Sequence, residues 1–133
     1  MKLFKTLEAL MPSENCKRLG YFGDTVATRQ FCDYYTKMND VELFKLKDLP
    51  LKRWNFGGEF FEAIIIEDDD FLDKAECIKM VKKALQENQN LIFISEKLGL
   101  TDVESKLEAF GFSDFTTVET EPYIYTAKKW FAY

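Results

Sequence analysis

Hydrophobic positions in this chain follow two periods, and the period changes along the sequence. Near the N terminus, apolar side chains recur every three or four residues and then meet Pro12, which predicts an amphipathic helix over residues 1–12. The members of this apolar stripe are Leu3, Leu7, Leu10 and Met11. We expect the stripe to pack against the core of its own domain, with a dimer contact as the alternative.

Helical spacing returns over residues 25–39, and Asn39 is expected to end that helix. Its apolar residues near one face are Val26, Phe31 (or Gln30), Tyr34 and Met38. Further helices are predicted over residues 72–88 and 101–111. In the last of them, Thr101 and Glu104 have the spacing of a capping box, and Gly111 is the C-terminal stop.

Strands are predicted where apolar residues alternate with polar ones or form short unbroken runs. The run Ile64-Ile65-Ile66 is continuous and β-branched, which is typical of a central strand covered on both faces. A turn at Glu121-Pro122 joins the last two strands, so we expect them to pair antiparallel. The expected strands cover residues 16–23, 41–46, 60–68, 91–95, 114–120 and 123–130.

Strands and helices alternate along the chain, which favours parallel pairing with right-handed crossovers. We therefore expect an α/β fold in three layers, with a mostly parallel sheet between helices on both faces. A C-terminal antiparallel hairpin over residues 113–130 completes the expected sheet. The chain has 133 residues and is expected to form one domain over residues 1–133.

Composition narrows the classes of function. The net charge is −5, the basic residues are dispersed, and no segment is long enough to span a membrane, so we expect neither nucleic-acid nor membrane binding. The chain contains no His, which removes His-based triads and imidazole metal ligands. An odd number of separated cysteines fits reduced thiols in a cytoplasmic protein: Cys16, Cys32 and Cys77.

Two long segments have the order of elements found in a known family. Over residues 47–94, an acidic-Leu-Pro loop leads through Phe61-Glu62 into a buried strand, a helix and another apolar strand. Over residues 107–129, a final helix, a Gly-Phe turn and a hairpin follow. Residues 48–129 thus resemble the class I S-adenosylmethionine-dependent methyltransferases, in which Phe-Asp stands at Phe61-Glu62. The resemblance implies a Rossmann-type fold.

In that family, a glycine-rich turn after the first strand lets the backbone approach the cofactor closely. The stretch GYFGDTVA resembles this turn, with Gly23 at the first glycine position, Thr25 at the second and Ala27 at the third. Tyr21 stands where the family usually has an acid, and Asp24 is the candidate substitute. The candidate cofactor-binding residues are Gly20, Gly23, Asp24, Thr25 and Ala27. The alternative is a plain tight turn that leaves the strand.

The second strand and the connection after it also depart from the family pattern. The family ends this strand in an acid that binds the ribose hydroxyls, but Lys45 and Lys47 lie near that point and Asp48 follows late. The stretch between residues 46 and 60 is too short for a full helix and strand, so we expect one such unit to be missing. These departures predict an eroded cofactor site.

Four consecutive acids, Glu67 to Asp70, follow the isoleucine run at the end of the strand where ligands bind in open α/β sheets. In the family this point faces the methyl donor and acceptor, which makes Asp68 and Asp69 the candidate catalytic residues. The acids alternatively hold Mg²⁺ through their oxygens. In a third interpretation, Asp70 or Asp69 caps the following helix and the other acids favour its positive end.

Two remaining features bear on partners and ligands. Gly57-Gly58 is expected to be a hinge into the isoleucine strand rather than a phosphate cradle, because no helix follows it. Unless the C-terminal aromatic residues fold back, they form an exposed apolar patch of the kind that marks an interface. These residues are Trp130, Phe131 and Tyr133.

We interpret the chain as a methyltransferase-like domain that has lost its cofactor and acts in protein association, as a homodimer or with a protein partner. The alternative is an active S-adenosylmethionine-dependent methyltransferase, since transfer to a good nucleophile needs mainly positioning and does not require His. A third alternative is a phosphate-handling domain that binds Mg²⁺ through the acidic cluster.

Overall fold

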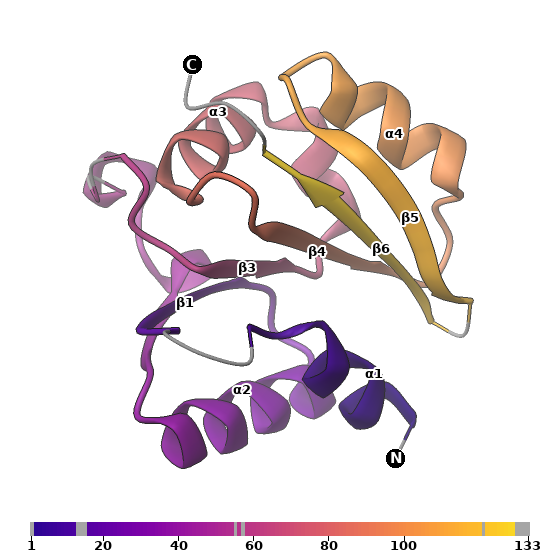
Figure 1. Cartoon of the computed structure of the whole chain (residues 1–133). Coiled ribbons are helices and arrows are strands. Elements are labelled where there is room, and N and C mark those ends of the chain that lie inside the picture. The colour runs from indigo at the N-terminus through magenta and orange to yellow at the C-terminus, as the bar shows by residue number, and fades with distance from the viewer. Residues whose placement is uncertain (1, 13–15, 55, 57, 121, 130–133) are drawn as a thin grey trace.

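The computed structural model describes residues 2–12, 16–54, 56, 58–120 and 122–129. The strands are β1 (Arg18–Phe22), β2 (Glu42–Lys45), β3 (Ala63–Ile66), β4 (Asn90–Ser95), β5 (Ser113–Thr120) and β6 (Tyr123–Lys128). They form one sheet in the order β2-β1-β3-β4-β6-β5 (Figure 1). Strands β2, β1, β3 and β4 run parallel, whereas β6 pairs antiparallel with both β4 and β5.

Helices cover both faces of this sheet, which confirms the predicted three-layer α/β fold with its C-terminal hairpin (Figure 1). One face carries α1 (Lys2–Leu10) and α2 (Val26–Asn39). The opposite face carries α3 (Ala75–Ala84) and α4 (Leu100–Glu108).

Side chains that alternate along each strand build a hydrophobic cluster on each face. On β3, Ile65 belongs to the cluster beneath α1 and α2, together with Leu7 and Phe31 from those helices. Ile64 and Ile66 belong to the other cluster, beneath α3 and α4. All four residues of β3 are buried, so the isoleucine run is a central strand covered on both faces, as predicted.

The connection between β2 and β3 is as short as the sequence predicted. Its described residues form two 3-10 helices, η1 (Leu46–Asp48) and η2 (Leu51–Arg53). Of the described strands, β2 is therefore the outermost on this side. Aromatic rings with centroids 5.0–5.6 Å apart pack beside it. They belong to Phe44, Phe56, Phe60 and Phe61.

Helix α2 carries two apolar stripes, and the sheet buries only one of them. The buried stripe consists of Thr28, Phe31, Cys32 and Tyr35. Val26, Tyr34 and Met38 lie on an exposed face with Gln30, whereas Phe31, the other residue predicted for this face, is fully buried. The spacing predicted one stripe, and the packing of the helix on the sheet decides which residues are inside.

The predicted capping box of α4 is wrong. The helix begins at Leu100 with Gly99 in the N-cap position, which places Thr101 inside the first turn. The C-terminal end agrees with the prediction, because Gly111 follows the helix with a φ of +94°.

Some predictions lie outside the described residues and stay predictions. They concern the hinge at Gly57, the turn residue Glu121 and the aromatic patch of Trp130, Phe131 and Tyr133. The assignment of the whole chain to one domain is likewise still a prediction. Within the described part of the chain, no helix is both long and apolar enough to cross a membrane.

A pair of glycine substitutions tests the turn after α4. We expect Gly111→Ala to lower the free energy of unfolding by about 1–2 kcal/mol, because its left-handed φ strains any residue with a Cβ and the added atom would meet Lys82. Gly58→Ala is the matched control, since its Cβ would lie 3.9 Å from the Lys83 carbonyl oxygen. The free energy of unfolding of the control, measured in urea, should change by less than about 0.5 kcal/mol. An equal loss of stability in both variants would contradict the backbone conformation assigned to Gly111.

Candidate functional site

The carboxyl ends of β1, β2, β3 and β4 meet at one edge of the sheet, where open α/β folds bind ligands. The loops after β1 and β3 bring two predicted site residues together there. The Lys47 ammonium lies 3.4 Å from Asp24 Oδ2 and 3.4 Å from Asp68 Oδ2. Lys47 follows β2, so this bridge joins the ends of three strands.

Glu67, directly after β3, is held by hydrogen bonds on both carboxylate oxygens. The Tyr21 phenol donates to its Oε1 at 2.8 Å, and the Thr28 hydroxyl donates to its Oε2 at 2.9 Å. The Glu67 N–H donates to the Phe22 carbonyl oxygen at 2.8 Å. The carboxylate thereby connects β1, β3 and the first turn of α2.

Sequence reasoning included Glu67 in the acidic cluster but gave it no site role of its own. It also missed Thr28, which is fully buried. A signal for this residue was present, because Thr28 is a polar residue on the same helical stripe as Phe31 and Cys32. A buried hydroxyl needs a hydrogen-bond partner, so its position predicts an acceptor on the sheet.

The Tyr21 phenol stays protonated over a wide pH range. Burial raises its pKa, and the hydrogen bond to Glu67 and the negative charge of that carboxylate raise it further. Nearby, burial raises the pKa of Cys32 to about 12, with smaller contributions from the charges of Asp33 and Glu67. Both groups therefore act as neutral side chains at physiological pH.

The ring of Tyr21 occupies the space over the turn at Gly23. A Cβ added to Gly23 would lie 2.7 Å from the Tyr21 hydroxyl oxygen and 2.9 Å from its Cε1. Such distances are far inside van der Waals contact, so only a residue without a Cβ fits under this ring. Gly23 thus has a local packing reason to be glycine.

Gly20 lies within β1 and faces the core rather than the loops. A Cβ at this position would approach Leu46 Cδ1 to 3.3 Å and the Phe61 ring to 3.4 Å. The residue is buried, and its neighbours belong to the cluster beneath α3 and α4.

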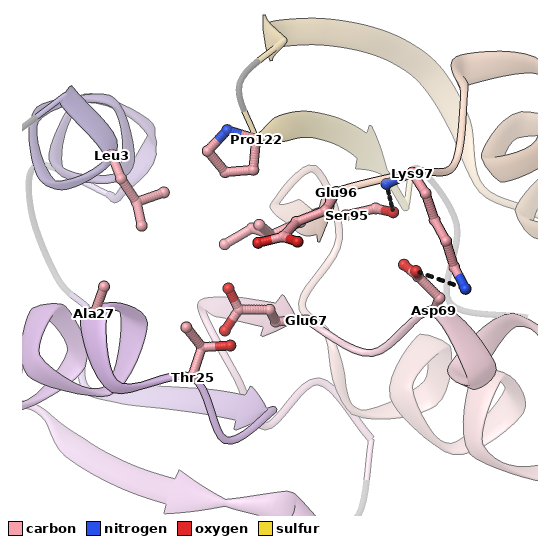
Figure 2. Close-up of a pocket in the computed structure, with 10 residues that line it drawn as sticks. Leu3, Thr25, Ala27, Glu67, Asp69, Ser95, Glu96, Lys97 and Pro122 are labelled. Atoms are coloured by element: carbon pink, nitrogen blue, oxygen red, sulfur yellow. Dashed lines mark hydrogen bonds and ion pairs between the residues drawn. The ribbon is translucent and has the colours of Figure 1, made fainter.

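A cleft of about 510 Å³ lies at the same edge, beside Glu67 (Figure 2). Three of the predicted site residues line it, namely Thr25, Ala27 and Asp69. The described residues of its lining are Leu3, Thr25, Ala27, Glu67, Asp69, Ile94, Ser95, Glu96, Lys97 and Pro122. Gly23, Asp24 and Asp68 are instead grouped around Tyr21 and Lys47.

The cleft has an acidic interior. Figure 2 shows the carboxylates of Glu67 and Glu96 pointing into it, between the walls formed by the start of α2 and the end of β4. Lys97 is the basic residue of the described lining, and its ammonium lies 3.9 Å from Asp69 Oδ2. Ser95 Oγ accepts the backbone N–H groups of Lys97 and Leu98, which fixes the loop after β4. The net negative charge of the residues that line this cleft favours a cationic ligand.

Asp68 caps the element that follows β3, which corrects the expected cap at Asp70 or Asp69. Its Oδ1 accepts the Asp70 N–H at 2.9 Å at the start of the 3-10 helix η3 (Asp69–Asp73). The α-helix expected from residue 72 begins only at Ala75. Among the residues that the structure describes, no three His, Cys, Asp or Glu side chains are grouped to hold a metal ion.

No protein-family model matches the sequence, and no curated protein is similar enough to match it. Solved structures do match. A methyltransferase dependent on S-adenosylmethionine from Archaeoglobus fulgidus is 10% identical, over 96% of this chain and 92% of its own, with a TM-score of 0.70. A chain from the Haloferax volcanii complex of the Trm112 methyltransferase activator with a methyltransferase is 6% identical, over 96% and 88%, with a TM-score of 0.69.

The [4+2]-cyclase SpnF is 12% identical, over 91% of this chain and 60% of its own, with a TM-score of 0.66. The chain therefore has the fold of the class I S-adenosylmethionine-dependent methyltransferases, as the resemblance implied. At these identities the likeness concerns the fold alone, and function depends on the site.

Removing one hydroxyl tests the hydrogen bonds of Glu67. We expect Tyr21→Phe to lower the free energy of unfolding by about 1–2 kcal/mol, because the part-buried carboxylate loses one of its two side-chain donors. Tyr123→Phe on β6 is the matched control, since it keeps the ring that stacks on Tyr125. Urea unfolding of the control should change by less than about 0.5 kcal/mol. A similar loss in both variants would contradict the role of the phenol.

The stability of the protein at alkaline pH tests the titration of the Tyr21 phenol. Above about pH 10, a tyrosine in the unfolded chain releases a proton that native Tyr21 keeps, so the native state binds more protons and stability falls with rising pH. The slope is at most about 1.4 kcal/mol per pH unit for one group. We expect Tyr21→Phe to show a shallower decline than the wild type in urea unfolding at alkaline pH. Parallel declines would show that Tyr21 ionises normally.

Proposed function

We propose that this chain is a methyltransferase-like domain that does not bind S-adenosylmethionine and acts through protein association. The position of Tyr21 carries the proposal. In the family, the backbone at the first glycine approaches the cofactor, whereas here the Tyr21 ring lies over Gly23. Moving the ring away would break its hydrogen bond to Glu67 and expose a buried aromatic side chain. The cofactor would have to displace part of the core.

Lys47 supports the same proposal. It lies near the point at which the family has its ribose-binding acid, and it pairs with Asp24, the candidate substitute for the acid missing at Tyr21. Both side chains of this pair are more than a third exposed, so the pair contributes little to stability. The second partner of Lys47, Asp68, is less exposed, and the fully buried ring of Tyr21 remains the stronger obstacle.

The comparisons support protein association as a use of this fold. One similar structure is a complex that contains a methyltransferase activator, so a fold of this kind occurs in a protein–protein assembly. Another is a cyclase, which shows that the fold is not tied to methyl transfer.

The cleft beside Glu67 favours a second candidate function, methyl transfer from S-adenosylmethionine. Its volume of about 510 Å³ lies within the usual range of small-molecule sites. Its acids would attract the sulfonium and ammonium groups of this cofactor, which supplies an activated methyl group when bound. Thr25, Ala27 and Asp69 would then contact it from the side, and Tyr21 could stay over Gly23. The magnesium alternative has no comparable support among the described residues.

Thermal unfolding with S-adenosylmethionine or S-adenosylhomocysteine at millimolar concentration tests the proposal. We expect no change in Tm, because the Tyr21 ring covers the turn at Gly23. A ligand present at 100 times its Kd stabilises by about 2.7 kcal/mol, which would raise Tm by several degrees in a domain of this size. A clear rise with either compound would overturn the proposal.

Thr25→Arg is the control that locates any binding. Thr25 is exposed at the mouth of the cleft, so a long side chain there fills the cleft without entering the core. A rise in Tm that this variant abolishes would establish the second candidate. Gly23→Arg is unsuitable as a control, because its Cβ alone would collide with Tyr21 and destabilise the fold.

A further inference from the structure

In the part of the chain that the structure describes, the large exposed apolar side chains are concentrated on α2. Among the described residues, five large apolar side chains are at least 37% exposed, and Val26, Tyr34 and Met38 are three of them, at 60%, 42% and 65%. With Gln30 they occupy positions i, i+4, i+8 and i+12, which form one line along the helix. Figure 1 places α2 at the outside of the molecule, with the sheet on its other side. This line is independent of the cleft.

A second line runs beside the first and carries alternating charges. It consists of Arg29, Asp33 and Lys37, which are exposed and one helical turn apart. We propose that the face formed by these two lines is the interface of a symmetric homodimer, in which the α2 helices of two copies pack antiparallel. The inference deepens the proposed function in protein association by naming the partner and the surface.

The charges favour a second copy of the chain as the occupant of this face. In an antiparallel two-fold pair, Arg29 lies opposite the partner's Asp33, and Asp33 lies opposite the partner's Arg29. A parallel pair would place like charges together, so the alternation selects the antiparallel arrangement. An isologous interface satisfies both charges of each copy with one contact repeated by symmetry.

The same register aligns the apolar residues. When Arg29 is opposite the partner's Asp33, Tyr34 falls opposite the interval between the partner's Val26 and Gln30. The ring therefore fits into a groove between two side chains of one ridge, which is the usual way in which helices pack. Two copies of this contact flank the two-fold axis.

Tyr34 is already held in place in the single chain. Its ring centroid lies 4.7 Å from that of Phe4 on α1, and Phe4 lies 5.1 Å from the buried Phe31. A side chain that is ordered before association loses little rotamer entropy on binding. Tyrosine anchors of this kind commonly supply much of the binding energy of an interface.

Sedimentation equilibrium of the full chain at micromolar concentrations tests the interface. We expect the mass of a dimer for the wild type. For Val26→Lys, which places a charge opposite the interval between the partner's Tyr34 and the partner's Met38, we expect a dimer Kd raised about tenfold or more. Val118→Lys is the matched control, because Val118 is an exposed apolar residue on β5, away from α2. Its Kd should stay within about threefold of the wild type, and Tm of each variant verifies that it folds.

Charge exchange tests the antiparallel register. Arg29→Asp alone and Asp33→Arg alone each place like charges opposite one another and should weaken the dimer, whereas the double variant should restore it. A monomeric wild type, a double variant as weak as the single ones, or dissociation by Val118→Lys but not by Val26→Lys would each overturn the inference. If the protein is a dimer and S-adenosylmethionine raises its Tm, only the proposed function is overturned. If the protein is a monomer and S-adenosylmethionine leaves its Tm unchanged, only the proposed interface is overturned.

Discussion

A carboxylate held between two hydroxyl groups organises the edge of the sheet at which the parallel strands have their carboxyl ends. Glu67 follows the central strand β3 and accepts hydrogen bonds from Tyr21 on β1 and Thr28 on α2. A part-buried carboxylate is costly unless its oxygens have donors, so these bonds specify how β1, β3 and α2 lie relative to one another. The course of the loop after β1 and the position of the cleft follow from that arrangement.

The same interaction changes the meaning of a glycine. A missing Cβ in the turn after the first strand is needed in the methyltransferase family because the cofactor approaches the backbone. In this chain, Gly23 accommodates the ring of Tyr21, which Glu67 holds in position. A glycine at this position is thus compatible with two kinds of site, one that holds a cofactor and one that the protein's own side chain fills. The neighbouring side chain decides between these two kinds.

The opposite edge of the sheet shows how the fold tolerates its short first half. Glu62 accepts the backbone N–H groups of Lys17 and Arg18 at 2.7 Å each, which fixes the start of β1 against β3. Beside β2, the rings of Phe44 and Phe60 pack at the outer side of the sheet, and the Arg18 guanidinium lies 4.3 Å from the Phe60 centroid. Aromatic packing and one buried carboxylate thus support this end of the sheet.

The sequence by itself determined the order of strands and helices, the buried run Ile64-Ile65-Ile66, the short connection after β2 and the closing hairpin. Each depends on periodicity or chain length, which are local properties. Only the tertiary structure decided that Tyr21 covers Gly23, that Asp68 rather than Asp70 is the cap, and which stripe of α2 is inside. The position of Tyr21 and the buried stripe of α2 depend on contacts between residues far apart in the chain, such as the hydrogen bond from Tyr21 to Glu67. The cap is a local contact, and it depends on where β3 ends. A linear pattern does not specify which side chain fills a shared space.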